Sequence, residues 1–133
     1  MTNLIAPALA AVFCGATFLS PVTITAQRLD SAIAGSWNFA ERDARIVMYA
    51  EADGNWTGVI EEARQARDVG WTLFRSLRFE TRYSVWRGRI VRPEGGAPVQ
   101  VTVRLAGSDT LMAVARRGLL SRTLVLTRVA GRP

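Results

Sequence analysis

The stretch that decides the fold reads RYSVWRGRIVR over residues 82–92, PEGG over 93–96 and APVQVTVRL over 97–105. Each arm alternates apolar and polar side chains, which is the period of a β-strand with one buried face. PEGG supplies a proline with a fixed φ and then two glycines that accept φ > 0, so it suits a tight turn. The stretch therefore predicts a β-hairpin, and a loop of two or four residues would give the same facing of its arms.

The two faces of this hairpin differ in chemistry. Even positions of the first arm lie opposite odd positions of the second, so apolar side chains gather on one face and charged ones on the other. Such a pair of strands needs a core on one side and water on the other. The apolar face holds Trp86, Gly88, Ile90, Val99, Val101, Val103 and Leu105, and the charged face holds Arg87, Arg89, Gln100, Thr102 and Arg104.

The other segments read as short strands added to the hairpin one after another. Segment 71–79 also fits a helix, but its alternation and its β-rich neighbours favour a strand. Short connections join neighbouring strands, and closure removes exposed sheet edges, so we expect an all-β, antiparallel, lipocalin-like up-and-down barrel of about eight strands. Besides the hairpin, the strands are expected at 35–39, 45–49, 56–60, 71–79, 110–116 and 119–129, the turns at 41–43, 52–55, 106–109 and 117–118, a loop at 61–68, and a lead-in at 27–34 with one helical turn begun by Asp30 or Ser31.

Residues 1–26 have the features of a signal peptide. The run 4–19 is apolar and alanine-rich, and Ile24-Thr25-Ala26 is a small-residue cleavage site, so we expect one β-barrel domain over 27–133 in the periplasm or secreted by a bacterium. The first residues carry no Lys or Arg, which leaves an uncleaved N-terminal anchor as the alternative. Lipidation at Cys14 is disfavoured, because bulky Phe13 precedes it. We expect no stable membrane span once the leader is removed.

The composition removes most kinds of catalytic chemistry. The chain has no His, its single Cys lies in the leader, and all seventeen basic residues are Arg. The usual general base, the thiol nucleophile, the Schiff-base amine and the commonest zinc ligands are therefore missing, and we expect no enzyme activity, no metal and no cofactor. The net charge of +6 favours acidic partners, although an arginine-rich and alanine-rich composition is also typical of a GC-rich genome.

A set of ordered motifs resembles a known family. Trp86-x-Gly88-x-Ile90-x-x-Pro93-x-Gly95 is similar to the exported bacterial family catalogued as domain of unknown function 2147. The resemblance implies a lipocalin-like barrel and no agreed activity. The chain departs from the family where Val99 or Val101 and Leu126 replace expected aromatic residues, which reduces the surface for ligand stacking. The resemblance extends over Gly35-x-Trp37, Asp53-Gly54, Gly58-x-Ile60, Val69-Gly70, Leu111, Gly118 and Leu126-Thr127-Arg128.

The same resemblance implies how the barrel closes. In lipocalin-like barrels the Trp of the first strand is covered by an Arg of the last strand, and Trp37 and Arg128 stand at these positions. A guanidinium within about 6 Å of an indole ring is attracted to its π face while its stem covers apolar surface. We therefore expect Arg128 to stack on Trp37.

The barrel interior is the first candidate binding site. Small eight-stranded barrels are either filled by side chains or hold one small ligand, and both alternatives stay open here. Gly58 and Gly88 point inward and are expected to leave space. The residues expected to line such an apolar pocket are Trp56, Trp86, Ile90, Val101, Val103 and Met112.

The outer face is the second candidate. Arg87, Arg89 and Arg104 form either an anion-binding patch or an ordinary solvated surface. Trp86 faces the other way, so the aromatic platform that nucleic acid binding needs is not assembled beside them. Glu61 and Glu62 could be half of a glycosidase carboxylate pair, but adjacent residues of a strand would point apart, and a solvated loop is favoured.

These observations predict an exported, non-catalytic, lipocalin-like barrel that binds a small apolar or amphipathic ligand or an envelope component. The alternative is an arginine-rich interaction or inhibitor-type protein whose outer face binds an acidic envelope partner. We expect nucleic acid not to be a partner.

Overall fold

The computed structural model describes residues 29–129 of the chain. The expected signal peptide, with Cys14, lies outside the described residues. No helix in the described part is both long and apolar enough to cross a membrane.

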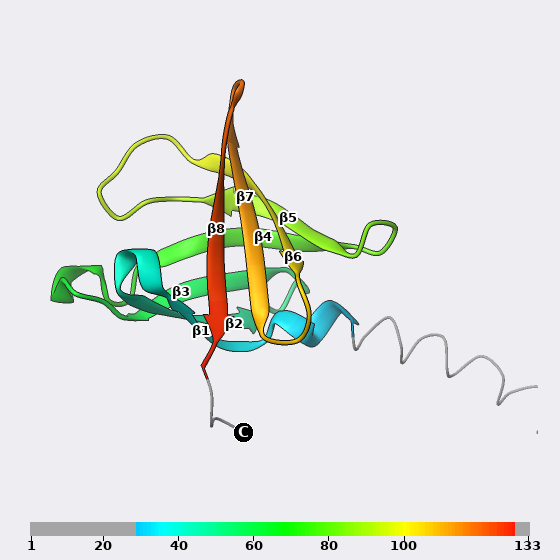
Figure 1. Cartoon of the computed structure of the whole chain (residues 1–133), viewed down its shortest axis with the longest axis horizontal. Coiled ribbons are helices and arrows are strands. Elements are labelled where there is room, and N and C mark those ends of the chain that lie inside the picture. Colours follow the sequence, from blue (N-terminus) through cyan, green and yellow to red (C-terminus); the bar gives the residue numbers. More distant parts are fainter. Residues whose placement is uncertain (1–28, 130–133) are drawn as a thin grey trace, which may run out of the picture.

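Eight antiparallel strands form one closed barrel in which each strand pairs with its neighbours in sequence, and β1 pairs with β8 (Figure 1). The predicted fold class, a small all-β up-and-down barrel, is confirmed. Short 3-10 turns occupy Ser31–Ile33 (η1), Ala40–Arg42 (η2) and Ala66–Asp68 (η3). The strands are β1 (Gly35–Phe39), β2 (Ala44–Ala50), β3 (Trp56–Glu62), β4 (Thr72–Glu80), β5 (Val85–Ile90), β6 (Val99–Leu105), β7 (Thr110–Arg117) and β8 (Leu120–Arg128).

The hairpin of β5 and β6 has the facing that its alternation predicts. Trp86 lies opposite Val103, and Ile90 lies opposite Val99, so the apolar side chains share the inner face. The connection is longer than expected, at residues 91–98, and the Val91 N–H at its start donates to the Leu73 carbonyl of β4 at 2.9 Å. An even number of loop residues keeps the parity, which is why the faces are still correct.

Strand β4 departs from strict alternation. Its pairing with β3 shifts around Gly58, and its pairing with β5 shifts between Arg75 and Arg78, where Ser76 has a φ of 55°. A bulge adds a residue to one strand and changes which side chains face inward. Phe74 is therefore buried beside Leu73, although the segment is the strand that was expected.

One barrel end, which we call the closed end, is covered by residues 30–34. Three indoles donate hydrogen bonds to this segment: Trp37 Nε1 to the Ile33 carbonyl at 3.0 Å, Trp86 Nε1 to the Asp30 carbonyl at 3.2 Å, and Trp56 Nε1 to Asp30 Oδ1 at 2.9 Å. Buried indoles need such partners, so the covering segment satisfies the polar atoms of the aromatic core. Asp30 therefore accepts a bond from a core tryptophan and makes no side-chain cap bond to η1.

Arg128 holds the closed end together. Its guanidinium carbon lies 4.3 Å from the Trp37 ring centroid, inside the range of a cation–π contact. The same guanidinium donates to the carbonyls of Ala34 at 3.0 Å, Ala32 at 2.9 Å and Ser108 at 3.0 Å. Because β1 and β8 share only two residue pairs, this one side chain carries much of the closure.

We predict that Arg128→Lys lowers the free energy of unfolding by about 2 kcal/mol or more, because an ammonium cannot reproduce the planar fork of donors. Urea unfolding of residues 27–133, which contain every strand, would measure the loss. Arg104→Lys is the matched control, since Arg104 has no ion pair in the described chain and should change stability by less than about 0.5 kcal/mol. Equal effects of the two changes would contradict the role of Arg128.

Candidate functional site

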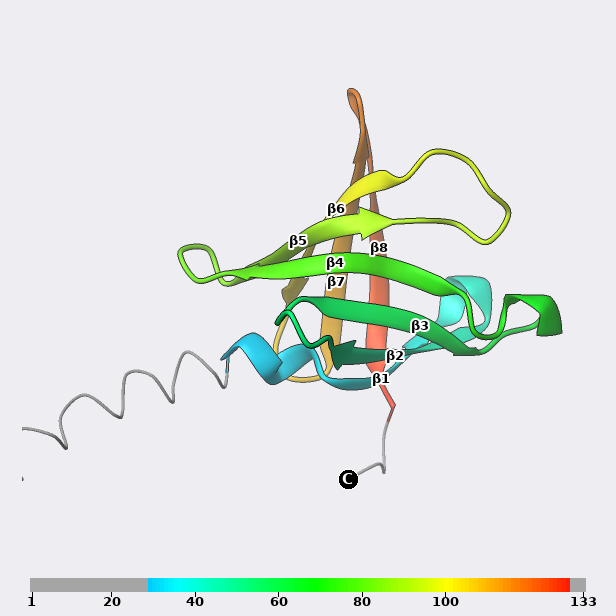
Figure 2. The ribbon, with the colours of Figure 1, turned by 180° about the vertical axis from the view of Figure 1, so that it is seen from behind.

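The barrel end opposite the closed end forms the candidate site. We call it the mouth; it is bounded by η2, the β3–β4 loop, the β5–β6 loop and the turn between β7 and β8 (Figure 2). Two hollows open there, and Glu41 and Arg42 of η2 line both of them.

The deep interior is packed rather than open. Trp56, Trp86, Val101 and Val103, which were expected to line a pocket, are all 5 % exposed or less and belong to the core. A Cβ at Gly88 would lie 2.6 Å from the Arg75 carbonyl oxygen, so this inward glycine is already filled by backbone. Likewise a Cβ at Gly58 would lie 2.8 Å from Phe74 Cδ2. The expectation that these glycines leave space was wrong, because the bulged β4 packs against both.

Met112 does not face the interior. It lies on β7 between the fully buried Leu111 and Ala113, and its cross-strand neighbours are Arg104 and the exposed Val125. Its expected place in an interior pocket was therefore wrong, because the inward positions of this strand are the odd ones. Ile90 is the one residue of the expected pocket that lines a hollow at the mouth.

The first hollow, which we call the apolar hollow, has a volume of about 470 Å³. Its floor is made by apolar side chains from six strands, and its rim carries guanidinium groups. Behind this floor the core is packed, and Phe74, which pairs with Ile90 of the floor, is fully buried. The floor residues are Phe39, Leu73, Ile90, Val99, Ala115, Leu120 and Leu124, and the rim residues are Glu41, Arg42, Arg92, Arg117, Ser121 and Arg122.

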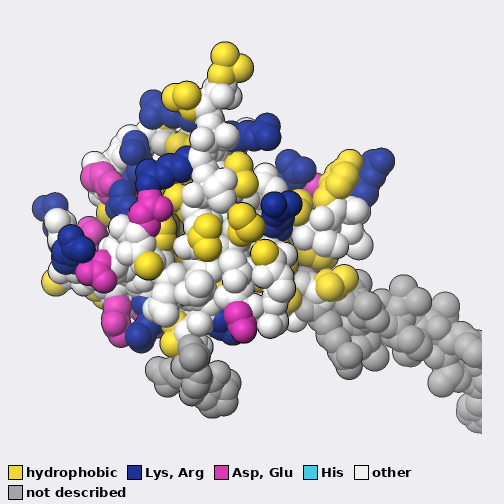
Figure 3. Space-filling view, in the orientation of Figure 1, with side chains coloured by type: hydrophobic (Ala, Val, Ile, Leu, Met, Phe, Trp, Pro, Cys, Tyr) yellow, Lys and Arg dark blue, Asp and Glu magenta, His cyan; other side chains and the backbone are white. Residues whose placement is uncertain are grey.

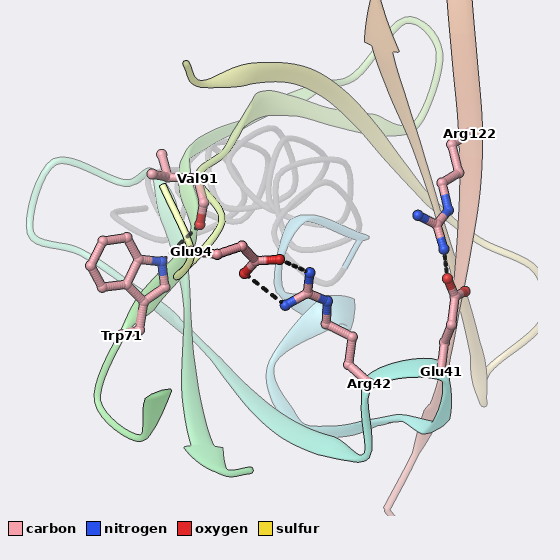
Figure 4. A network of polar contacts seen from close by, with 6 residues as sticks. All are labelled: Glu41, Arg42, Trp71, Val91, Glu94 and Arg122. Atoms are coloured by element: carbon pink, nitrogen blue, oxygen red, sulfur yellow. Dashed lines mark hydrogen bonds and ion pairs between the residues drawn. The ribbon is translucent and has the colours of Figure 1, made fainter. Parts of the chain in front are cut away.

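A gap in the barrel wall gives this hollow its opening. Strand β1 ends at Phe39, and β8 pairs with it only at Thr127 and Arg128, so the first part of β8 has no strand on that side. Arg122 of β8 forms an ion pair with Glu41 of η2 across the gap (Figure 4). A side-chain contact therefore replaces the backbone ladder at this point.

A second ion pair crosses the mouth. Arg42 donates to both carboxylate oxygens of Glu94 in the β5–β6 loop, with Nη1 3.0 Å from Oε1 (Figure 4). The hydrogen bonds from Arg42 lower the pKa of Glu94 from 4.5 to about 2, and the same contact raises the pKa of Arg42. The loop is also held by Trp71, whose Nε1 donates to the Val91 carbonyl at 2.7 Å.

The second hollow at the mouth is larger, at about 750 Å³, but more highly charged. It lies on the other side of η2, and both signs of charge line it, so its surface is well solvated. A third hollow of about 580 Å³ is lined by polar groups around the β2–β3 turn. The apolar hollow is therefore the better candidate for a ligand with a hydrocarbon part. The charged lining of the second hollow comprises Glu41, Arg42, Arg64, Arg67, Asp68 and Glu94.

Two guanidiniums on the rim of the apolar hollow are available to an anion. In residues 29–129 neither Arg92 nor Arg117 forms an ion pair, whereas Arg42 and Arg122 are already paired. Sequence reasoning missed all four of these arginines. They lie in turns and at strand ends, where alternation gives no information on direction.

The expected anion patch lies on the outer face of β5 and β6. Arg87 donates to Glu80 at 2.8 Å, whereas Arg89 and Arg104 have no ion pair among the described residues. Arg89 lies opposite Arg75, and Arg87 lies opposite Arg78, so like charges face each other across β4 and β5. The patch is therefore larger than the sequence alone indicated.

The part of the chain that the structure describes contains no group of three or more His, Cys, Asp or Glu side chains able to hold a metal ion. No family model, curated protein or solved structure matches the chain. The resemblance to domain of unknown function 2147 therefore stays a prediction.

The packed interior makes a prediction for Gly88. We expect Gly88→Ala to lower the free energy of unfolding by about 1–3 kcal/mol, because its Cβ would overlap the Arg75 carbonyl. Arg89→Ala, the next residue on the same strand, points outward and should cost less than about 0.5 kcal/mol. Urea unfolding distinguishes the two; an unchanged midpoint for Gly88→Ala would mean that the interior has room after all.

The ion pair between Arg42 and Glu94 leads to a prediction of how stability changes in acid. The pKa of Glu94 is lowered by folding, so its contribution is complete above pH 4.5 and disappears as the pH falls toward 2. We expect Glu94→Gln to cost at most about 1 kcal/mol, because the pair is exposed. The difference in urea midpoint between the natural protein and this variant should shrink to zero near pH 2. A difference that stays constant from pH 7 to about 2 would contradict the pairing.

Proposed function

We propose that the protein is an exported, non-catalytic binding protein whose mouth takes a small amphipathic ligand with an anionic head group. The observation that carries the proposal is the apolar hollow, which has two unpaired guanidiniums, Arg92 and Arg117, on its rim. Export rests on the signal peptide expected at residues 1–26.

The size of the hollow supports a ligand of modest length. A volume of about 470 Å³ lies within the range of small-molecule sites. Phe74, which is fully buried and pairs with Ile90 of the floor, belongs to the packed core behind it, so a hydrocarbon chain would lie in the mouth and not along the barrel axis. Burial of its methylene groups against the floor would supply about 0.8 kcal/mol each.

The rim supports an anionic head group. Guanidinium groups present a planar fork of donors that matches a carboxylate or a phosphate, and the rim carries two that are unpaired, Arg92 on the β5–β6 loop and Arg117 at the end of β7. Each hydrogen bond to a charged group contributes about 1.5–3 kcal/mol.

The carboxylates at the mouth favour binding over catalysis. Glu41 is paired with Arg122, and Glu94 with Arg42. The pKa of Glu94 is moved to about 2, away from the neutral range in which a general acid or base is efficient. Both groups are better placed to hold the mouth in shape than to transfer protons.

The arginine-rich outer face supports the second candidate function, binding of an acidic envelope partner. Directly opposed like charges destabilise a sheet, and Arg75–Arg89 and Arg78–Arg87 are two such pairs on neighbouring positions. Glu80 is the carboxylate paired with this group. A polyanion would relieve the repulsion, and its binding would weaken steeply with salt.

Calorimetric titration of residues 27–133 with dodecanoate, dodecyl phosphate and dodecanol below their micellar concentrations tests the first function. We expect saturable binding of both anions. Arg92→Gln with Arg117→Gln should weaken it at least about tenfold, because charge-assisted bonds to the head group are lost. Arg89→Gln with Arg104→Gln removes the same charge from the outer face and should leave the affinity unchanged.

The floor is tested separately with Ala115→Leu, which places a larger side chain in the hollow and should abolish binding of all three amphiphiles. Val114→Leu, on the outer side of the same strand, is its control. No saturable binding by the natural protein, or equal affinity in the Ala115→Leu protein, would overturn the proposal.

A further inference from the structure

The turn between β7 and β8 presents leucines to solvent. Leu119 is 104 % exposed and Leu120 is 76 % exposed. The two strands extend beyond the rest of the barrel (Figure 1), and apolar side chains occupy the end of the extension with basic ones close by (Figure 3). We call residues 116–122 the hairpin tip. Two adjacent, largely exposed leucines leave apolar surface in water, so the tip is suited to an apolar surface outside the chain.

The charges of the hairpin tip have one sign. Arg116, Arg117 and Arg122 flank the leucines, and residues 110–129 contain no carboxylate. Gly118 has a φ of 61°, which lets the chain reverse tightly and project the side chains that follow it. The tip therefore combines an apolar end with three guanidiniums, of which Arg122 is paired with Glu41 and Arg116 and Arg117 have no ion pair in the described chain.

We propose that the hairpin tip docks on an anionic lipid bilayer, with Leu119 and Leu120 among the acyl chains and the arginines at the head groups. Apolar burial together with attraction to anionic lipids is what binds a protein to a membrane interface. This inference goes beyond the proposed ligand binding and does not depend on it, because the tip can dock whether or not the hollow is occupied.

The shape of the tip favours a bilayer over a protein partner. A stable protein interface buries about 800 Å² on each side, and one convex turn with two leucines offers far less. A lipid surface yields around a protrusion and needs no complementary pocket. Each arginine near an anionic surface adds an attraction that a neutral membrane lacks.

Docking by the tip would orient the mouth. Leu120, Arg117 and Arg122 belong both to the hairpin tip and to the lining of the apolar hollow. A docked tip therefore brings the opening of the hollow to the membrane surface, where single-chain amphiphiles are present.

Flotation with lipid vesicles tests the inference. Residues 27–133, which lack the apolar leader, should bind vesicles of phosphatidylcholine with about one-third phosphatidylglycerol and not vesicles of phosphatidylcholine alone. Leu119→Ser should weaken binding at least about tenfold. Val69→Ser, which changes another exposed apolar residue at the same barrel end, is the matched control and should have no effect.

The charge is tested with Arg116→Gln, expected to weaken vesicle binding about fivefold, against Arg104→Gln on the outer face, expected to change it less than twofold. In the Leu119→Trp variant, the fluorescence of the introduced tryptophan should shift to the blue on phosphatidylglycerol vesicles. Brominated acyl chains should quench this fluorescence. Leu119 and Arg116 line none of the three hollows, so Leu119→Ser and Arg116→Gln should leave dodecanoate binding unchanged. A failure of membrane docking can therefore be distinguished from a failure of ligand binding.

Absence of binding to the phosphatidylglycerol vesicles would overturn the inference, as would equal losses from Leu119→Ser and Val69→Ser. Sedimentation velocity tests whether the leucines instead contact a second copy of the chain. A dimer that Leu119→Ser dissociates would assign the leucines to a second copy of the chain instead of a bilayer.

Discussion

The contact of Arg128 with Trp37 is the constraint on which the rest of the structure depends. Strands β1 and β8 share only two residue pairs, so the backbone ladder alone closes the barrel weakly. Arg128 adds a cation–π contact at 4.3 Å and three hydrogen bonds to carbonyls from separate parts of the chain. Since all of this closure is concentrated at one end, the wall between η2 and the first part of β8 is left to an ion pair, and the mouth opens there.

The two ends consequently handle polar groups in opposite ways. At the closed end the indoles of Trp37, Trp56 and Trp86 are hydrogen-bonded to residues 30–34, and all three side chains are buried. At the mouth the apolar side chains of the strand ends lack such a cover, and exposed ion pairs that contribute little to stability hold the surrounding loops. The contacts that close the barrel thus lie at one end, and the ligand that we propose would bind at the other.

The sequence predicted the barrel because a period of two and short turns determine which strands pair, and the parity of the β5–β6 hairpin survived a longer loop. Prediction from the sequence failed where the alternation of apolar and polar residues does not indicate which side chains face inward. Every residue from Leu111 to Ala115 is apolar, so only the pairing with β6 places Met112 outside. The bulges of β4 depend on contacts with Gly58 and Gly88, which bring distant segments together and leave no local signal. The mouth is built from loops and strand ends, whose directions are set by the closed barrel.

The distribution of the guanidiniums over the barrel is not what base composition alone would produce. If the arginines only reflected a GC-rich genome, they would be scattered over the surface and would form ion pairs wherever carboxylates happened to be near. Instead the closed end uses Arg128 as a structural clamp, whereas arginines without ion pairs gather on the outer face of β4 to β7 and around the mouth. Repulsion among these arginines destabilises the folded barrel, and an anion bound at the outer face or at the mouth would reduce this repulsion. Much of the unpaired positive charge therefore lies on two basic surfaces, the outer face and the mouth, and these are the surfaces for which we propose anionic ligands or partners.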